Sequence, residues 1–495
     1  MNPDQVKLLD EYRKELRDVY SQIPVEKIYL NSRSEMPFNF MDPDKKLRSV
    51  SLDPMTSSVI ISAIVPKSAV LFKGGHGGGK TTMIEEVSSR LFDVSRDEIV
   101  AAMIRGNDDQ NVNTLLASYD MGKLITGKGE DVKWRKFVTC PVKIADEINR
   151  FPPTAQNALF EIFNKGRVEF ANEVYDIKQF ELFATMNPND PGTYPMSRPF
   201  LDRFGLCIPV PQMPSAEDLM SLSSRKDDKI YKHEIPEKRL TLDKSMEMEK
   251  IIADNVKLSP DALLYSIYLG QSLSSCIRGD FGDKSHSELG LEERCQGCEF
   301  STPESLCRKS QDGFSGRAFL DMQRWAKGYS FFLNAFEDSS NPEVQLGILE
   351  GIVPYVLYHR LTPNNSFFTK DPYHGRQLTY LKDIASKARQ AYLMVKGPLL
   401  EIPDILAGRI DPKKAQINSV KKDLVVLTHF KPIVDAVAMP DFRATYDAIE
   451  GNDHITKEDV VSLNNTLTFN TELPPRARAF LREKAYNKSK GGQSL

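Results

Sequence analysis

The chain has 495 residues, of which 40% are hydrophobic and 27% are charged, and this length predicts two or three domains with substantial cores. Its formal net charge of −3 excludes a strongly basic protein and gives no overall electrostatic reason to bind nucleic acid. The apolar run at 59–72 is broken by Pro66 and Lys67, so the sequence predicts no membrane span. The start of the chain lacks the basic and apolar regions of a signal peptide, and we therefore expect a cytoplasmic protein.

The first predicted element is an amphipathic helix over Gln5–Ile23, because its apolar residues recur at helical spacing. These residues are Leu8, Leu9, Tyr12, Leu16 and Val19. A polar segment follows, so residues 1–45 are expected to form an N-terminal helix and a linker.

A glycine-rich loop lies between a predicted strand at Ser68–Phe72 and a predicted amphipathic helix at Thr81–Phe92. The loop fits the phosphate-binding pattern G-x-x-x-x-G-K-[ST], in which backbone N–H groups and a helix N-terminus surround a phosphate. Lys80 would reach the β- and γ-phosphates of ATP, and Thr81 would hold Mg²⁺. A glycine-rich turn with a chance Lys-Thr is the alternative, but both flanking elements favour the P-loop. The predicted nucleotide-binding residues are Gly74, Gly75, His76, Gly77, Gly78, Gly79, Lys80, Thr81 and Thr82.

An acidic pair follows the next strand-like segment. Residues 137–145 are mostly apolar and lead into Asp146 and Glu147. Downstream of a P-loop, the first carboxylate of such a pair holds Mg²⁺, and the second orients and deprotonates the attacking water. Alone, the pair is weak evidence, since most acidic pairs after a strand are helix N-terminal charges. We therefore predict Asp146 as a magnesium ligand and Glu147 as the general base.

Four further motifs indicate a family. The chain reads Asp-Glu-Ile-Asn-Arg at 146–150, Ala-Thr-Met-Asn-Pro at 184–188, Gly-Thr-Tyr-Pro at 192–195 and Leu-Asp-Arg-Phe at 201–204. Together with the P-loop, these motifs resemble the MoxR family of AAA+ ATPases over about 47–361. The resemblance implies an α/β P-loop AAA+ domain with a parallel sheet flanked by helices, followed by an all-helical lid and a helical C-terminal region.

The resemblance also implies roles for three residues at matching positions. Asn187 is similar to the sensor-1 asparagine, which orients the attacking water, and Arg203 is similar to the arginine finger that acts on a neighbouring subunit's ATP. A planar, always charged guanidinium suits the charge that develops on the phosphoryl oxygens. Arg198 and Arg150 compete for the finger role, and an ordinary surface salt bridge is the other alternative for Arg203. Arg317, within Ser-Gly-Arg-Ala at 315–318, is similar to the sensor-2 arginine that contacts ATP in its own subunit.

Two positions depart from the family's usual proline. His76 stands in the P-loop, where the loss of proline would make the loop entry less rigid. Gly316 stands in the lid motif beside Arg317. Neither departure removes a charge that would contact phosphate.

Two predicted hairpins lie between the P-loop and Asn187. Residues 122–129 have basic and glycine residues at a predicted turn, and residues 167–175 look like a second hairpin. In ring ATPases that resemble this chain, such hairpins face the central channel. Ordinary surface hairpins are the alternative, because spacing alone does not place them in a pore.

The predicted lid carries a cysteine-rich insertion at about 270–310. Of the six cysteines, Cys140 and Cys207 lie in predicted strands as small core residues. The other four lie in a polar, charged segment, and in an intracellular chain such a group favours a metal over disulfides. We expect a zinc ion first, a [4Fe–4S] cluster second and no metal third. His286 lies in the same segment and could replace one cysteine as a ligand. The four predicted ligands are Cys276, Cys295, Cys298 and Cys307.

The predicted division of the chain has four parts. They are an N-terminal helix and linker at 1–45, an AAA+ nucleotide-binding domain at 46–212, a helical lid at 213–362 and a helical C-terminal domain at 363–495. The clearest apolar segments of the last part are Leu424–Phe430, Ile433–Ala438 and Lys457–Leu463. The tail Asn487–Leu495 is expected to be disordered.

Two classes of function are compatible with these features. The first is a MoxR-type AAA+ ATPase, an ATP hydrolase whose homo-oligomeric ring, a hexamer, remodels or assembles a client complex with a von Willebrand factor A-domain partner. The second is a nucleic-acid-dependent AAA+ motor with a metal or iron–sulfur centre. The net charge and the motifs at 146–150 and 201–204 favour the first class, whereas the cysteine group and basic hairpin residues favour the second. An inactive structural subunit is disfavoured, because Lys80, Asp146 and Glu147 are all present.

Overall fold

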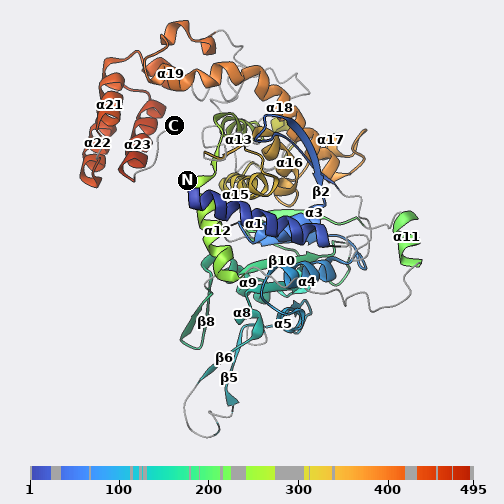
Figure 1. Cartoon of the computed structure of the whole chain (residues 1–495). Coiled ribbons are helices and arrows are strands. Elements are labelled where there is room, and N and C mark those ends of the chain that lie inside the picture. Colours follow the sequence, from blue (N-terminus) through green and yellow to red (C-terminus); the bar gives the residue numbers. More distant parts are fainter. Residues whose placement is uncertain are drawn as a thin grey trace. The chain divides into compact units, whose positions relative to one another are not determined.

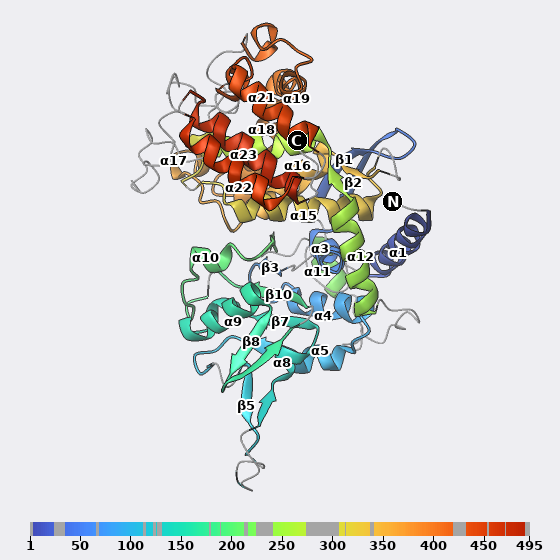
Figure 2. The ribbon, with the colours of Figure 1, turned by 90° about the vertical axis from the view of Figure 1, so that its left-hand side faces the viewer.

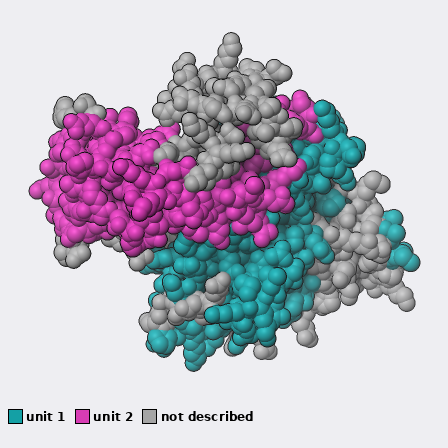
Figure 3. Space-filling model, turned by 90° about the horizontal axis from the view of Figure 1, so that it is seen from above, with its two compact units in different colours: residues 1–262, 315–362, 368–385 teal, residues 263–314, 363–367, 386–495 magenta. Residues whose placement is uncertain are grey.

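The computed structural model describes residues 3–23, 35–65, 69–111, 115–121, 125, 131–177, 180–188, 190–211, 216–223, 241–273, 306–311, 313–336, 341–418, 432–452, 455–470 and 472–490. The chain divides into two compact units, which are described separately (Figure 3). Unit 1 comprises 1–262, 315–362 and 368–385, and unit 2 comprises 263–314, 363–367 and 386–495. Neither unit is a continuous stretch of chain.

Unit 1 is built on a five-stranded parallel sheet (Figure 1). Its strands, in spatial order, are β11 (Leu206–Pro209), β3 (Ala69–Lys73), β10 (Glu181–Met186), β7 (Val142–Asp146) and β4 (Ile104–Arg105). The three central strands are buried almost throughout, as expected for a parallel sheet that helices cover on both faces. Because Met186 is in register with Lys73, and Ala184 with Ala145, the three strands end at the same edge of the sheet. The predicted parallel sheet flanked by helices is confirmed.

Two helices of unit 1 illustrate how the sequence sets helix limits. α3 (Pro54–Ser62) is buried along its whole length, and the carboxylate of Asp53 accepts a hydrogen bond from the Thr56 N–H at its start. α9 (Pro153–Lys165) begins with proline and ends at Gly166, whose φ of 63° favours glycine. The other helical elements of this region are α4 (Lys80–Leu91), α5 (Arg96–Ala102), α8 (Lys136–Thr139), η1 (Ile148–Arg150) and α10 (Arg198–Leu201).

The segment before β7 differs from the prediction. The sequence predicts one strand over 137–145, whereas the structure has the short helix α8, a bend at Cys140 and then β7. The buried ammonium group of Lys143 in β7 donates to the backbone carbonyls of residues 137, 138 and 140, at 2.7–2.8 Å. These bonds satisfy carbonyls that the end of α8 leaves without intrahelical partners. Cys140 therefore lies outside the strands, while Cys207 lies in β11 and is buried as expected.

Lys143→Met should destabilise unit 1 by about 1–3 kcal/mol, because buried carbonyls would lose their donor. Burial lowers the pKa of Lys143 to about 7, and the charge of the nearby Cys140 opposes this shift. The two tryptophans, Trp134 and Trp325, both lie in unit 1, so their fluorescence during urea denaturation reports on this unit. Lys46→Met, at an exposed position, is the control. Equal midpoints for the two variants would contradict the role of Lys143.

The N-terminal helix α1 (Pro3–Gln22) confirms the predicted helix, and Leu9, Tyr12, Leu16 and Val19 are buried. Arg13 and Arg17 donate to the carbonyls of Phe331 and Phe332, both at 2.8 Å, near the end of α15 (Gly316–Leu333). The last carbonyls of a helix need such donors, since they lack intrahelical partners. These bonds tie the N-terminal helix to α15.

A hairpin that the sequence analysis does not predict follows α1. β1 (Met36–Met41) pairs antiparallel with β2 (Leu47–Leu52), so the predicted linker contains a strand. α16 (Leu346–Leu357) packs so closely on β1 that a Cβ at Gly347 would come within 1.9 Å of the Asn39 carbonyl oxygen. Glycine is therefore required at this crossing.

Several elements complete unit 1 or have residues in both units. Within unit 1 these are α11 (Ala216–Ser223), α12 (Leu242–Asn255), and the paired strands β12 (Lys257–Leu258) and β13 (Glu343–Val344). The helices with residues in both units are α13 (Pro260–Ser272), α17 (Asn365–Phe368) and α18 (Gln377–Leu400). The chain after residue 212 is mainly helical in its described residues, as predicted, but the expected all-helical lid contains the short strand pair β12 and β13.

The described part of unit 2 is helical. Its remaining elements are η3 (Leu306–Arg308), α19 (Ile402–Leu406), η4 (Pro412–Lys414), η5 (Gln416–Asn418), α21 (Pro440–Gly451), α22 (Lys457–Phe469) and α23 (Pro475–Ser489). The buried Lys484 of α23 pairs with Glu450 of α21. Phe442 stacks with Tyr446 and with Phe480 at ring separations of 6.2 and 6.3 Å. The Lys484–Glu450 pair and the Phe442–Phe480 stack join α21 to α23.

Two predictions for the C-terminal region have different outcomes. The apolar segment Lys457–Leu463 lies in α22, whereas Leu424–Phe430 lies outside the described residues. The prediction of disorder from Asn487 is wrong for its first residues, because α23 continues to Ser489. Lys488 donates to the carbonyl of Ile449 at 2.8 Å, which holds the end of this helix.

Candidate nucleotide-binding site

The loop between β3 and α4 has the backbone shape of a phosphate cradle. Gly77 and Gly79 both have a φ of 73°, a left-handed conformation that glycine adopts without strain. A Cβ at Gly74 would lie 2.4 Å from the Val210 carbonyl oxygen, so only glycine fits where the loop leaves the sheet. The loop ends at the N-terminus of α4, whose free N–H groups favour an anion.

A cavity of about 240 Å³ opens beside this loop. The structure brings together the P-loop, the acidic pair and Asn187, which lie up to 111 residues apart in the chain. Thr185 also lines the cavity and is missed by the sequence analysis, although it belongs to the motif at 184–188. The lining residues are His76, Gly77, Gly78, Gly79, Lys80, Thr81, Thr82, Asp146, Glu147, Thr185 and Asn187.

The predicted magnesium ligands lie side by side. The Thr81 hydroxyl donates to Oδ1 of Asp146 at 2.9 Å, and the Thr185 hydroxyl donates to the same oxygen at 2.6 Å. A hydroxyl and a carboxylate in contact form a donor set of oxygens, which suits Mg²⁺. Thr185 fixes the orientation of the carboxylate from the neighbouring strand β10.

Lys80 lies against its own loop. Its ammonium group donates to the Gly74 carbonyl at 3.0 Å and also to the Gly75 carbonyl. Burial lowers the pKa of Lys80, and the charges of Asp146 and Glu147 oppose this shift. The two carboxylates therefore help to keep the ammonium group charged at the cavity.

Glu147 has an unusual backbone conformation at the end of β7. Its φ of 53° is left-handed, and its N–H donates to the Thr185 hydroxyl at 2.9 Å. A Cβ at Gly106 would lie 2.2 Å from the Glu147 carbonyl oxygen, so the neighbouring glycine makes room for this turn. A non-glycine residue in this region is rare and must be held by its surroundings. The conformation directs the Glu147 side chain into the cavity.

Arg150, His76 and Asp190 lie around the Glu147 carboxylate. Arg150 places Nη1 3.1 Å from Glu147 and donates from Nε to Asp190 at 2.7 Å. His76 has Nδ1 3.6 Å from Glu147 and Nε2 3.7 Å from Asp190. Ligand atoms of His76, Glu147 and Asp190 lie within 4.8 Å of one another, but the Arg150 cation beside them disfavours a metal ion there.

The structure places the other two predicted arginines outside the lining of this cavity. Arg203 stacks on Phe160, with 3.5 Å between its Cζ and the ring centroid, and donates to the Pro199 carbonyl at 2.6 Å. Arg317 pairs with Asp202 at 3.2 Å. Arg150, the alternative candidate for the arginine finger, pairs with Glu147 and Asp190, and these carboxylates balance its positive charge.

Asp202 connects the motif at 201–204 to the lid helices. It accepts from the Ser315 hydroxyl at 2.8 Å, where Ser315 also caps α15. It accepts from Nε of the buried Arg360 at 2.9 Å as well as from Arg317. The residue next to Arg203 is therefore bonded to both the start of α15 and the chain after α16.

The two hairpins project from the same end of unit 1 (Figures 1 and 2). β5 (Ala117–Tyr119) pairs with β6 (Val132–Trp134), and β8 (Arg167–Phe170) pairs with β9 (Glu173–Asp176). Aromatic pairs join them, with ring separations of 5.6 Å for Tyr119 and Phe170 and 5.4 Å for Trp134 and Tyr175. The predicted hairpin at 167–175 is confirmed, whereas most of 122–129 lies outside the described residues.

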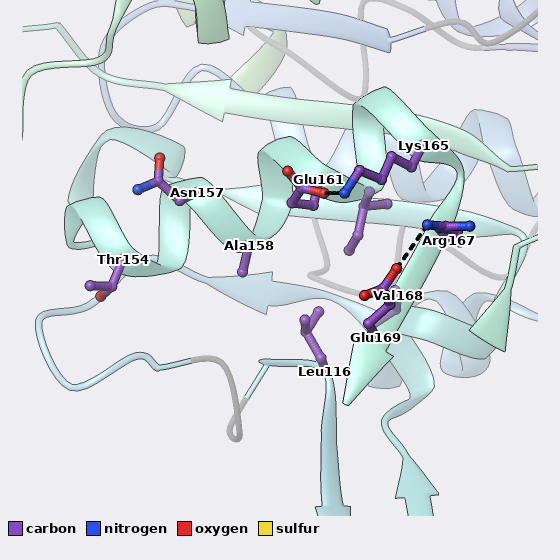
Figure 4. Close-up of a pocket in the computed structure, with 10 residues that line it drawn as sticks. Leu116, Thr154, Asn157, Ala158, Glu161, Lys165, Arg167, Val168 and Glu169 are labelled. Carbon is purple, nitrogen blue, oxygen red and sulfur yellow. Dashed lines mark ion pairs between the residues drawn. The ribbon is translucent and has the colours of Figure 1, made fainter. Parts of the chain in front are cut away.

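A second cavity, of about 330 Å³, lies between α9 and β8 (Figure 4). Leu116, Ile162 and Val168 form its apolar part, and ion pairs join Glu161 to Lys165 and Arg167 to Glu169 at its rim. These charges neutralise one another, so this cavity is a weaker candidate for an anionic ligand than the P-loop cavity.

The predicted metal ligands Cys276, Cys295 and Cys298 lie outside the described residues, as does His286. Cys307 is described and lies half-buried in η3. Among the helices that the structure describes, none combines the length and apolar character that crossing a bilayer requires.

Comparisons with known proteins agree with this geometry. Residues 69–206 match the model of the ATPase family associated with various cellular activities (AAA). The uncharacterized protein YeaC of Bacillus subtilis is 27% identical over 174 residues, which are 33% of this chain and 50% of YeaC. Midasin of Dictyostelium discoideum is 26% identical over 211 residues, which are 40% of this chain and 3% of midasin. The chain therefore spans about half the length of the first relative and a small part of the second.

A crystal structure of "a putative ATPase" from Cytophaga hutchinsonii resembles this chain with a TM-score of 0.55. The two are 19% identical, and the match covers 77% of this chain and 96% of the other. At this identity the likeness concerns the fold alone. With the family match over residues 69–206 and the P-loop cavity, it supports the fold of an AAA-type nucleotide-binding domain in this part of the chain.

Proposed function

We propose that this chain is a MoxR-type AAA+ ATPase, which couples ATP hydrolysis in a homo-oligomeric ring to the remodelling or assembly of a client protein complex. The observation that carries the proposal is the 240 Å³ cavity, where the P-loop, Asp146, Glu147 and Asn187 meet. The MoxR assignment is supported by the sequence motifs at 146–150, 192–195 and 201–204.

ATP is the proposed substrate, and the loop supplies its phosphate contacts. Backbone N–H groups at the start of α4 would donate to phosphate oxygens, and Lys80 would exchange its bonds to the loop carbonyls for the phosphates. The Thr81 hydroxyl and Asp146 would hold Mg²⁺. When bound, Mg²⁺ supplies charge neutralisation for the phosphates.

Hydrolysis needs a base and a group that orients the water. Glu147 would accept a proton from the attacking water, whose oxygen bonds to the γ-phosphorus as the bond to ADP breaks. Asn187, at the end of β10, would orient that water. Both residues line the cavity, and the backbone of Asn187 is anchored by Asn149, which donates to its carbonyl at 2.8 Å.

In a homo-oligomeric ring, Arg203 of one subunit could act on the ATP bound by its neighbour. As the resemblance to an arginine finger implies, the guanidinium of Arg203, which does not line the described cavity, would serve the ATP of a neighbouring subunit. Arg317 would reach the nucleotide of its own subunit only after leaving Asp202. We propose a hexamer that works with a von Willebrand factor A-domain partner, as the resemblance implies.

Lys80→Ala should abolish ATP binding, because the phosphates lose their cationic partner in the loop. Binding of a fluorescent ATP analogue to the purified chain measures this, with Lys46→Ala as a control at an exposed position. Unchanged affinity in Lys80→Ala would show that ATP binds elsewhere.

Turnover that rises on addition of DNA would favour the nucleic-acid-dependent alternative.

The cysteine group remains a prediction. The purified chain is expected to contain about one zinc ion or one [4Fe–4S] cluster, held by Cys276, Cys295, Cys298 and Cys307. Metal analysis of anaerobically purified protein separates the two, because only the cluster is coloured and contains iron. Metal-free protein with four titratable thiols would exclude both.

A further inference from the structure

His76 contacts two of the predicted catalytic residues at once. It lies in the P-loop, its side chain is 62% exposed, and it lines the same cavity as Glu147 and Asn187. Its Nε2 is within hydrogen-bond distance of the side-chain nitrogen of Asn187, and its Nδ1 lies 3.6 Å from Oε1 of Glu147. The imidazole therefore bridges the residues that would deprotonate and orient the attacking water.

The contact between Asn187 and Nε2 of His76 suits one neutral tautomer of the imidazole. The side-chain nitrogen of Asn187 can only donate, so Nε2 of His76 acts as the acceptor. In the neutral imidazole the proton then lies on Nδ1, the nitrogen that faces Glu147. The ring can thus accept from the orienting residue and offer its N–H toward the base.

Arg150 completes the surroundings of Glu147 from the other side. Its Nη1 lies 3.1 Å from Oε2, whereas His76 approaches Oε1, so each carboxylate oxygen faces a different partner. Arg150 is itself held by Asp190, which also accepts from the Gly192 N–H at 3.2 Å. With one partner on each oxygen, rotation of the carboxylate is restricted.

We propose that His76 is a positioning residue for ATP hydrolysis, which holds Glu147 and Asn187 at a fixed separation around the attacking water. It acts through these two residues. The proposal rests on the proposed function, because it assumes that Glu147 and Asn187 serve hydrolysis. A proline at this position has no polar side-chain atom and would leave both partners without this bridge.

Three variants separate positioning from loop shape. His76→Ala and His76→Pro should lower kcat by about 10- to 100-fold, the scale expected when reacting groups are misplaced. Their affinity for ATP should stay unchanged, because Lys80 and Thr81 are untouched. His76→Gln should recover most of the turnover, since its amide oxygen can accept from Asn187 while its NH₂ group donates to Glu147.

A second measurement does not depend on turnover. ADP with aluminium fluoride mimics the transferring phosphoryl group, so slow release of fluorescent ADP from that complex reports the aligned site. His76→Ala should shorten this trapping without changing the release of ADP alone. In the Glu147→Gln background, His76→Ala should lower residual turnover less than it does alone, because part of its effect passes through Glu147.

The outcomes distinguish the inference from the function on which it rests. A purified chain that does not hydrolyse ATP would overturn both. Loss of turnover in Glu147→Gln together with normal turnover and trapping in His76→Ala would overturn the inference alone. Equal loss of ATP binding in His76→Ala and His76→Gln would also overturn it, because His76 would then shape the loop rather than position the base.

Discussion

Glu147→Gln should bind ATP as the unmodified chain does and lose turnover by roughly 10²–10⁴-fold, the contribution typical of a general base. The amide keeps the size of the side chain but cannot accept the proton of the attacking water. The oxygens predicted to hold Mg²⁺ belong to Thr81 and Asp146, and they are unchanged. Phosphate release measures turnover, and a fluorescent ATP analogue measures binding.

Two controls make this test specific. Glu11→Gln, at an exposed position on α1, makes the same chemical change away from the cavity and should leave turnover unchanged. Asp146→Asn should instead weaken the dependence of ATP binding on Mg²⁺, because a magnesium ligand loses its charge. If Glu147→Gln hydrolyses ATP at the unmodified rate, another group must activate the water.

Local sequence was sufficient to predict the phosphate-binding loop and the strands beside it. The positive φ values at Gly77 and Gly79 occur where the pattern requires glycine, and β3 and α4 begin and end within a few residues of their predicted limits. Apolar runs that end at charged residues mark parallel strands, because such strands are buried along their length and finish at one edge. The resemblance of the motifs to those of a known family then predicted which residues share one site.

Side-chain hydrogen bonds and contacts between distant segments could not be read from the sequence. The apolar run at 137–145 has the composition of a strand. Lys143 of this run donates hydrogen bonds to the carbonyls at the end of α8, so the run forms a short helix followed by a strand. Residues 36–41 look like part of a linker, because their partners in β2 and α16 lie outside any local window. In both places a long-range or side-chain contact outweighs the local pattern.

The same limit applies within the candidate site. Thr185 lies inside a recognised motif, yet its bonds to Asp146 and to the Glu147 N–H depend on the pairing of β10 with β7. The bridge from His76 to Asn187 spans 111 residues, and the sequence marks it only by the absence of the family's usual proline. Sequence motifs thus identify which residues meet, and the sheet determines how they bond.

Arg203→Ala should leave ATP affinity nearly unchanged and lower turnover by about 10³-fold or more, because an arginine finger acts mainly on charge in the transition state. The guanidinium now stacks on Phe160, and its Nε has no hydrogen-bond partner among the described residues, so moving it to a phosphate breaks few bonds. Arg48→Ala is the matched control, since this exposed arginine pairs with Asp42 in the β1–β2 hairpin.

Mixing two inactive variants tests whether Arg203 acts between subunits. In a ring that contains both Arg203→Ala and Glu147→Gln, some sites combine an intact Glu147 with an intact Arg203 from the neighbour. Those sites should hydrolyse ATP, so the mixture should be more active than either variant alone. Each variant alone gives rings in which every site lacks one of the two groups. If rings shown to be mixed remain inactive, Arg203 serves its own subunit. Asp202, the residue next to Arg203, accepts a hydrogen bond from Ser315 at the start of α15, so a movement of α15 would then be expected to carry Arg203 to its own site.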